Sequence, residues 1–214
     1  TAIGQITITN PNTVAGTTFS WTRDNTGGNL TGMGASGSGA TINGTLTNTT
    51  TTQQTTIFTI TATAGSCTST TTVNVKVDPT PLVNNIANQA FCQNQNGAAV
   101  NFGSNVAGAT FSWTSTANVG FGTSGNGNIP AYVAINSPVT ATVSVTATAN
   151  GCSGPVKTFT ITVYPLPSVT IVADYCLVPG KVRLTANPLP AGSYTYLWTN
   201  GATTSFIDVD IAGS

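Results

Sequence analysis

The sequence has no histidine and no glutamate, and only 5% of its 214 residues are charged. Five lysines and arginines balance five aspartates, so the formal net charge is zero. This balance argues against a nucleic-acid binder or a polybasic membrane-surface binder, because both need a basic surface. Without histidine, neither a Ser-His-Asp nor a Cys-His catalytic site can be assembled within the chain. We therefore expect a protein that is not an enzyme and carries no cofactor and no metal.

Long apolar runs and helical periodicity are missing as well. No stretch approaches the roughly 20 apolar residues of a membrane-spanning helix, and no window has a helical apolar stripe. Threonine instead makes up about a fifth of the chain. Its branched Cβ favours extended backbone, and its hydroxyl keeps the outer face of a sheet hydrated. The composition therefore predicts an all-β fold.

A long repeat organises the chain. Phe-Ser-Trp-Thr occurs at residues 19–22 and 111–114, and a weaker copy ends near Trp198. Glycine-rich passages follow the first two copies, at residues 32–39 and 120–127. The period of roughly 85 to 92 residues is too long for a solenoid and suits a β-sandwich domain. The glycine-rich passages do not predict a phosphate-binding loop, because such a loop carries a lysine and is followed by a helix. Turns of a sandwich are favoured instead.

Alternating strand patterns and double prolines close each repeat. Alternation of apolar and polar residues predicts strands with one buried and one hydrated face. These strands span residues 55–63, 70–77, 140–148 and 156–163. A Val-x-Pro-x-Pro motif then ends each strand pair and reads as a short, semi-rigid linker in extended polyproline geometry. The linker residues are Pro79, Pro81, Pro165 and Pro167.

These boundaries predict tandem Ig-like or PKD-like sandwiches joined by short proline linkers. We expect an N-terminally truncated Ig-like repeat at residues 1–79 and a complete Ig-like repeat at 80–165. A C-terminally truncated PKD-like repeat is expected at 166–214. The truncations are inferred from the repeat positions of the cysteines and tryptophans.

Four cysteines occupy two repeat positions, early and late. The pattern predicts one disulfide per domain, and we expect the pair Cys92–Cys152. Cys67 and Cys176 would then pair with partners outside the sequence. Four free buried thiols and a Cys67–Cys176 bond are the alternatives. Disulfides indicate an oxidising, extracytoplasmic location.

Aromatic and acidic residues offer a few candidate ligand contacts. Trp21, Trp113 and Trp198 share one repeat position, which favours buried core residues over sugar-stacking platforms. Asp208 and Asp210 share one face of a predicted strand, and a hydrated strand face is favoured over a Ca²⁺ site. The polar residues 45–56 predict a surface loop and a candidate ligand contact.

The chain resembles the repeat regions of giant cell-surface adhesins of gliding Bacteroidota, the SprB-like family. The resemblance covers the whole chain and lies in the Phe-Ser-Trp-Thr segments, the Gly-Cys-Ser-Gly turn at residues 151–154 and the Val-Tyr-Pro-Leu-Pro linker at 163–167. It implies Ig-like or PKD-like sandwiches in long arrays that are exported by the type IX system. Residues 197–204 resemble the PKD-like variety.

The resemblance implies a non-catalytic stalk of a secreted surface adhesin that supports attachment and gliding. The expected location is extracellular, at the cell surface and attached to the outer membrane. Expected partners are neighbouring repeats of the same chain, extracellular polysaccharide or surfaces, and the secretion and motility machinery, with no membrane insertion. The alternative is a set of carbohydrate-binding or accessory modules of a large secreted enzyme.

Overall fold

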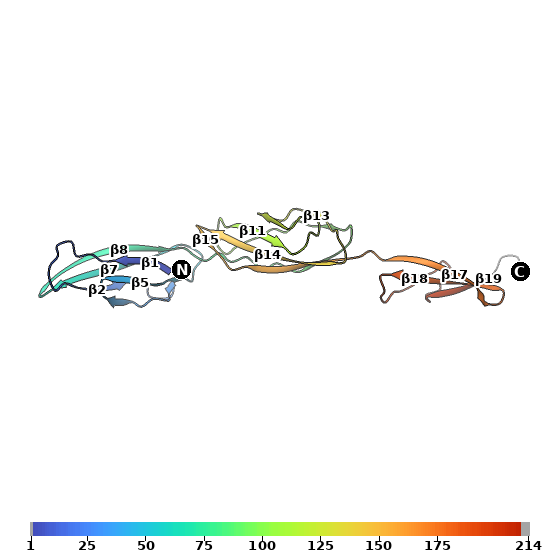
Figure 1. Cartoon of the computed structure of the whole chain (residues 1–214), viewed down its shortest axis with the longest axis horizontal. Helices are drawn as coiled ribbons and strands as arrows, with labels where there is room; N and C mark the ends of the chain where they lie inside the picture. Colours follow the sequence, from blue (N-terminus) through green and yellow to red (C-terminus); the bar gives the residue numbers. More distant parts are fainter. Residues whose placement is uncertain (1, 211–214) are drawn as a thin grey trace.

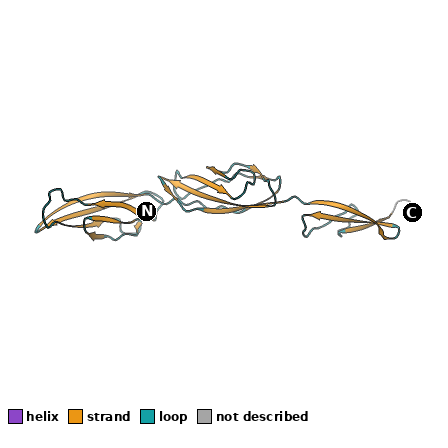
Figure 2. Ribbon diagram, in the orientation of Figure 1, coloured by secondary structure: helices purple, strands orange, loops and turns teal. Residues whose placement is uncertain are grey.

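The computed structural model describes residues 2–210, in which every regular element is a β-strand. The strands form three groups that follow one another along the chain and lie in a row (Figures 1 and 2). In this part of the chain no helix has the length and apolarity that crossing a membrane requires. The predicted all-β class with several sandwich sheets is confirmed.

The first group contains strands β1 to β8. Their bounds are β1 Ala2–Thr7, β2 Thr18–Arg23, β3 Leu30–Thr31, β4 Ser36–Ser38, β5 Thr41–Thr45, β6 Thr47–Asn48, β7 Gln54–Ala64 and β8 Cys67–Val77. The main sheet has the order β4-β2-β7-β8, and β1–β5 and β3–β6 form two further pairs. Strands β7 and β8 pair without interruption from Gln54↔Val77 to Ala64↔Cys67, around a turn at Gly65.

The second group contains strands β9 to β16. Their bounds are β9 Gln89–Cys92, β10 Asn96–Gly97, β11 Thr110–Ser115, β12 Ser124–Asn126, β13 Tyr132–Val133, β14 Val139–Ala149, β15 Cys152–Ser153 and β16 Lys157–Tyr164. The main sheet has the order β12-β11-β14-β16-β9, and β15 pairs with the end of β14. Strand β9 runs parallel to β16, whereas the other neighbours are antiparallel.

The core of the second group follows from alternation along β14 and β16. Val143 and Val145 of β14 and Phe159 and Ile161 of β16 are buried, while Ser144 and Thr160 between them face outward. Burying a side chain of this size contributes about 1.5–3 kcal/mol relative to leaving it exposed. The alternation read from the sequence therefore supplies the main part of this core.

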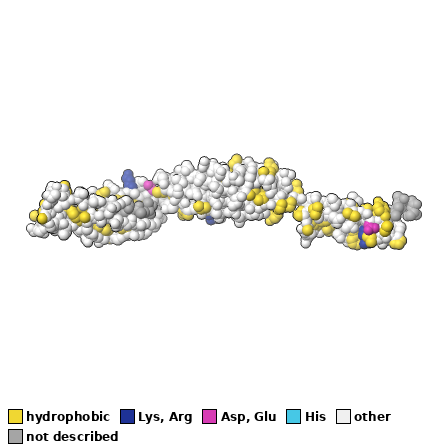
Figure 3. Space-filling view, viewed as in Figure 1, with side chains coloured by type: hydrophobic (Ala, Val, Ile, Leu, Met, Phe, Trp, Pro, Cys, Tyr) yellow, Lys and Arg dark blue, Asp and Glu magenta, His cyan; other side chains and the backbone are white. Residues whose placement is uncertain are grey.

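The third group contains β17 Ser168–Val178, β18 Lys181–Leu189 and β19 Phe206–Asp210 in one antiparallel sheet. Ile171 lies opposite Ala186 and Val169 opposite Pro188, so one face of the sheet is apolar. This face is only partly covered: Ala186 is buried, whereas Val169 is 60% and Ile171 50% exposed. Figure 3 accordingly shows hydrophobic side chains gathered over the third group.

The predicted domain boundaries, at 79/80 and 165/166, fall in the segments between the groups. Residue 1 of the first predicted domain and residues 211–214 of the third lie outside the described residues. The division into three domains remains a prediction.

Candidate functional site: the junctions between strand groups

The first linker, residues 78–82, is enclosed between the first and second groups. The side chain of Pro79 is fully buried, and Pro81 is also buried. Asp78 Oδ1 accepts hydrogen bonds from Gln53 Nε2 of the first group at 3.0 Å and from Asn150 Nδ2 of the second at 3.1 Å. One carboxylate thus connects both groups across the linker.

The far end of the first linker is fixed to the second group. The Leu82 amide donates to Asn105 Oδ1 at 2.6 Å, and the Asn105 amide donates to the Leu82 carbonyl at 3.3 Å. Val83 then forms a bridge with Ser104. The linker is therefore held by hydrogen bonds at both of its ends.

Gly154 lies directly against the first linker. A Cβ at this position would meet the Pro81 carbonyl oxygen at 1.7 Å, so no other residue fits without displacement of the backbone. The Gly154 amide donates to the Ala147 carbonyl at 2.8 Å, and regular pairing with β14 resumes only at Lys157. The hairpin is interrupted at the place where the linker passes.

The second linker, residues 165–167, is exposed in comparison. Tyr164, which takes the place of Asp78 in the repeat, is 56% exposed, and Leu166 is 51% exposed. Pro165 is half-buried and Pro167 is exposed. Among residues 2–210, no hydrogen bond or ion pair joins the third group to the second. The two double-proline motifs therefore have different surroundings.

Two of the three repeat tryptophans lie in cores, and a glycine makes room for each. Trp21 is 8% and Trp113 5% exposed. Each indole lies over a glycine of the neighbouring strand, Gly37 for Trp21 and Gly125 for Trp113, where a Cβ would be 2.4 Å from the ring. Part of each glycine-rich passage is therefore a strand that accommodates an indole.

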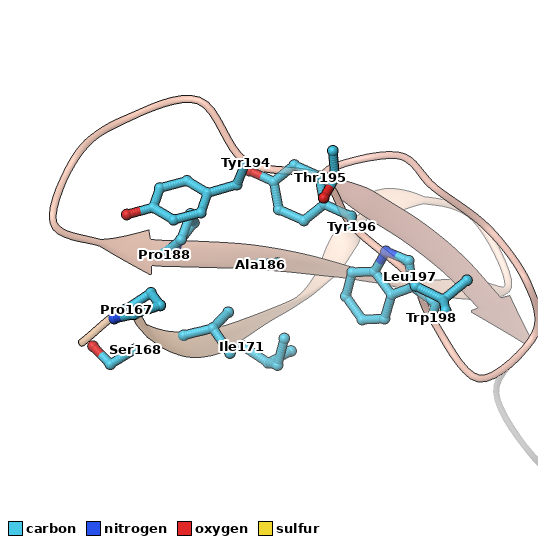
Figure 4. A pocket seen from close by; sticks show the side chains of 11 residues that line it. Pro167, Ser168, Ile171, Ala186, Pro188, Tyr194, Thr195, Tyr196, Leu197 and Trp198 are labelled. Atoms are coloured by element: carbon cyan, nitrogen blue, oxygen red, sulfur yellow. The ribbon is translucent and has the colours of Figure 1, made fainter. Parts of the chain in front are cut away.

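Trp198 is only half-buried and lies in an open groove of about 340 Å³ on the third group. Tyr194, Tyr196, Ile171 and Ala186 also line the groove (Figure 4). Its indole N–H donates to the Thr204 carbonyl at 2.8 Å, which fixes the ring. The third repeat tryptophan is thus an accessible aromatic surface rather than an enclosed core residue.

The expected Cys92–Cys152 disulfide is absent, and all four cysteines are free. Strand register gives the reason. Cys92 lies opposite Tyr164 at one end of β16, whereas Cys152 lies opposite Ala149, beyond Lys157 at the other end. The seven residues of β16 between these ends span about 23 Å, and a disulfide needs Cα atoms within roughly 7 Å.

Cys67 and Cys176 are also far from any partner in the described chain. Cys67 begins β8 at the hairpin turn of the first group, and Cys176 lies near the end of β17 in the third. Cys67 and Cys152 both follow a hairpin turn, opposite Ala64 and Ala149. Sequence spacing carried no information about which end of a strand each cysteine occupies.

Asp208 and Asp210 are engaged with cations of β18. Asp208 accepts from Arg183 Nε at 2.8 Å and Nη2 at 3.0 Å, and Asp210 pairs with Lys181 at 3.1 Å. The hydrogen bond from Arg183 lowers the pKa of Asp208. The same bond raises the pKa of Arg183, whose guanidinium lies 4.2 Å from the Phe206 ring centroid. Within residues 2–210, no three cysteine or acidic side chains group as metal ligands would.

The expected polar loop at residues 45–56 is more ordered than its sequence indicates. Asn48 is buried, and its Nδ2 donates to Val77 O at 2.8 Å and Thr52 O at 2.7 Å. Thr56 is also buried, and its hydroxyl bonds Asp24 O at 2.9 Å. The Asn48–Val77 hydrogen bond fixes the end of β8 that leads into the first linker.

The sequence did not reveal the roles of four residues that shape these sites: Asp78, Asn150, Gly125 and Gly154. The Asn-Gly pair at 150–151, with positive φ at both residues, was readable as a hairpin turn. Nothing local marked Gly154 as a contact of a linker more than 70 residues earlier. One signal was available. In the turn segments around Cys67 and Cys152, the residue two positions after the cysteine differs: it is Ser69 in the first repeat and Gly154 in the second.

Residues 5–81 match the family model described as "PKD-like domain". This match covers the first strand group and reaches the first linker. No curated protein matches the chain.

Among solved structures, the chain is similar to an I-band fragment of titin, with 11% identity and a TM-score of 0.39 over 92% of this chain and 78% of that one. The human desmocollin-1 ectodomain shares 13% identity with a TM-score of 0.37, over 100% and 50% of the two chains. Domains 4–9 of surface layer protein SbsC share 13% identity with a TM-score of 0.27, over 88% and 29%. At these values the fold assignment rests on the chain's own strands and on the PKD-like match.

Proposed function

We propose that this chain is a non-catalytic stalk segment of a secreted bacterial cell-surface adhesin. It would supply length and stiffness, while adhesion and gliding would be properties of the complete protein. We also propose the three domains 1–79, 80–165 and 166–214 as the units of this stalk. Their partners would be neighbouring repeats, and export by the type IX system follows from the resemblance described above.

The enclosed first linker is the observation that carries this proposal. Pro79 and Pro81 are buried at a junction, and Asp78 bonds side chains on both sides of it. Independent domains move relative to each other by default unless an interface restrains them. A junction that specific contacts hold in one arrangement is useful to a protein that must keep its length or transmit force. A set of separate binding modules does not need one.

Surface composition is consistent with an extracellular location. Threonine and asparagine replace lysine and glutamate on the outer strand faces, which leaves five lysine or arginine sites for trypsin-like proteases. In β14 and β16 the outward residues are mainly threonines, as at Thr140 and Thr162, whose hydroxyls lie 3.1 Å apart. Such a surface stays hydrated with few charges.

Replacement of the segment in the producing bacterium tests the stalk function. Residues 1–214 would be exchanged for an unrelated row of sandwich domains of equal length, or deleted. A stalk predicts that surface adhesion survives the exchange and falls on deletion, because length matters and side chains do not. Loss of adhesion in a well-exported exchange strain would contradict the proposal.

Carbohydrate binding at the third group is the second candidate, favoured by the groove around Trp198. Tyr194, Tyr196 and Trp198 line this groove (Figure 4). The faces of aromatic rings are suitable platforms for sugar rings. Glycan-array binding that disappears in Tyr196→Ala, but not in Tyr164→Ala, would support this candidate. Tyr164 is the matched control, being an exposed tyrosine outside the groove.

A further inference from the structure

We propose that the turn at residues 150–154 is a docking seat for the Asp-Pro-x-Pro linker of the preceding repeat, and that it holds the first two groups as one rigid body. This inference does not depend on the stalk function, because a flexible arm would also serve as a stalk. It concerns which surface of a repeat receives its neighbour and which sequence that surface accepts.

The seat is shaped for backbone contact. The missing side chain of Gly154 leaves the space that the Pro81 carbonyl oxygen occupies. Gly154 has no left-handed φ that would require glycine, so the close approach of the linker is the reason for this residue. Packing at such distances leaves no room for even one added carbon.

The interruption of the hairpin is specific to the second group. The first group carries Ser69 where the second has Gly154, and its strands β7 and β8 remain paired through Ala62↔Ser69. The two eleven-residue strands of the first hairpin thus pair without a break. The second group has Pro155 in place of Thr70, and a proline has no amide to donate to the ladder. In the second group, Pro155 and Val156 leave the ladder after the Gly154–Ala147 hydrogen bond, and Val156 is exposed while Pro81 is buried.

Polar contacts select the linker sequence. Asn150 Nδ2 donates to Asp78 Oδ1, which also accepts from Gln53, so an acceptor is needed just before the first proline. The second linker has Tyr164 at this place, and a phenol on an exposed ring cannot reproduce the carboxylate. The seat therefore fits the first double-proline motif and not the second. The second junction lacks these contacts, so the movement of the third group relative to the second is the comparison for the first junction.

Spin-label distances across each junction test the proposal in the full chain. One label is placed at Cys67 and the other at Ser112→Cys, an exposed position of β11, with the other cysteines changed to serine. The native pair Cys92 and Cys176 reports on the second junction in the same way. Pulsed dipolar spectroscopy gives the distance distribution of each pair.

We expect a narrow distribution across the first junction and one at least about twofold wider across the second. Gly154→Val should widen the first distribution to a similar extent, because its side chain displaces Pro81. Gly27→Val, at a glycine with open space around its Cβ position, is the matched control and should leave it narrow. Asp78→Ala provides a second variant that adds no bulk.

Two results would overturn the proposal. The first is a wild-type distribution across the first junction as wide as that across the second. The second is a first distribution that stays narrow in both Gly154→Val and Asp78→Ala. Tryptophan fluorescence, to which the buried Trp21 and Trp113 contribute, shows whether each variant is folded. A misfolded Gly154→Val leaves the decision to Asp78→Ala.

Discussion

Replacing Gly125 with alanine should destabilise the second group, because the new methyl group would enter the ring of Trp113. The Cβ of an alanine at this position would lie 2.4 Å from Cζ2 and 2.8 Å from Cε2 of the indole. Both residues are held in register on β12 and β11, so neither can withdraw alone. Trp113 is 5% exposed, belongs to the core of the second group and has the Phe121 ring centroid 5.3 Å away.

The magnitude follows from two opposing effects. Overpacking a well-filled core costs about 1–3 kcal/mol. Replacing glycine with alanine also stabilises by about 0.4–1 kcal/mol, since it lowers the entropy of the unfolded chain. The expected net loss is thus about 1–2 kcal/mol in the free energy of unfolding of the second group.

Hydrogen exchange of peptides from residues 143–148 of β14 measures this loss in the full chain, since this part of β14 pairs with β11. Gly4→Ala is the control, because the Cβ position of Gly4 is open. The double variant Gly125→Ala with Trp113→Leu should lose most of the penalty, because the ring is gone. An equal penalty with and without the indole would refute the reasoning.

Three further predictions follow from single groups. Reducing the purified chain should leave its intact mass unchanged, because Cys92 and Cys152 lie at opposite ends of β16; a gain of two hydrogens would contradict the register. Burial raises the pKa of Tyr132 to about 12, so its phenol should ionise last in an ultraviolet titration, and Tyr132→Phe should remove that late step. Because the folded pKa of Tyr132 is raised, its contribution to stability is complete below the pKa of an unfolded tyrosine and is lost as pH rises through about 12. The hydrogen bond from Arg183 lowers the pKa of Asp208 instead, so the contribution of Asp208 to stability is present above the ordinary aspartate pKa and is lost as pH falls through the lower folded pKa. Asp208→Asn should therefore remove this acid dependence from the unfolding of the third group. An unchanged acid dependence would contradict the pairing with Arg183.

The sheets were predictable from the sequence because burial follows a period of two. Val143 and Val145 face the core as their alternation indicates, and threonines occupy the outer face. The repeat of the tryptophan segment also located β2 and β11 correctly, because one local sequence makes one local strand. The alternation of apolar and polar residues was sufficient to predict a strand wherever the neighbouring strands also bury one face and expose the other.

The junctions and the cysteine pairing were not predictable, because both depend on how distant segments meet. Cys92 lies on a strand that runs parallel to β16, and this direction decides at which end the thiol appears. Gly154 reads locally as a turn glycine, although its neighbour is the Pro81 carbonyl. The double prolines look equivalent in sequence, and the difference between them lies in Asp78 against Tyr164 and in what each one faces.

Small-angle X-ray scattering of the whole chain tests the central claim, which is that separate sandwiches stand in a row. A compact protein of this length would have a radius of gyration of about 17 Å. The row in Figure 1 predicts a clearly larger radius and an asymmetric distance distribution with a long tail. A value near the compact one, with a symmetric distribution, would contradict the account.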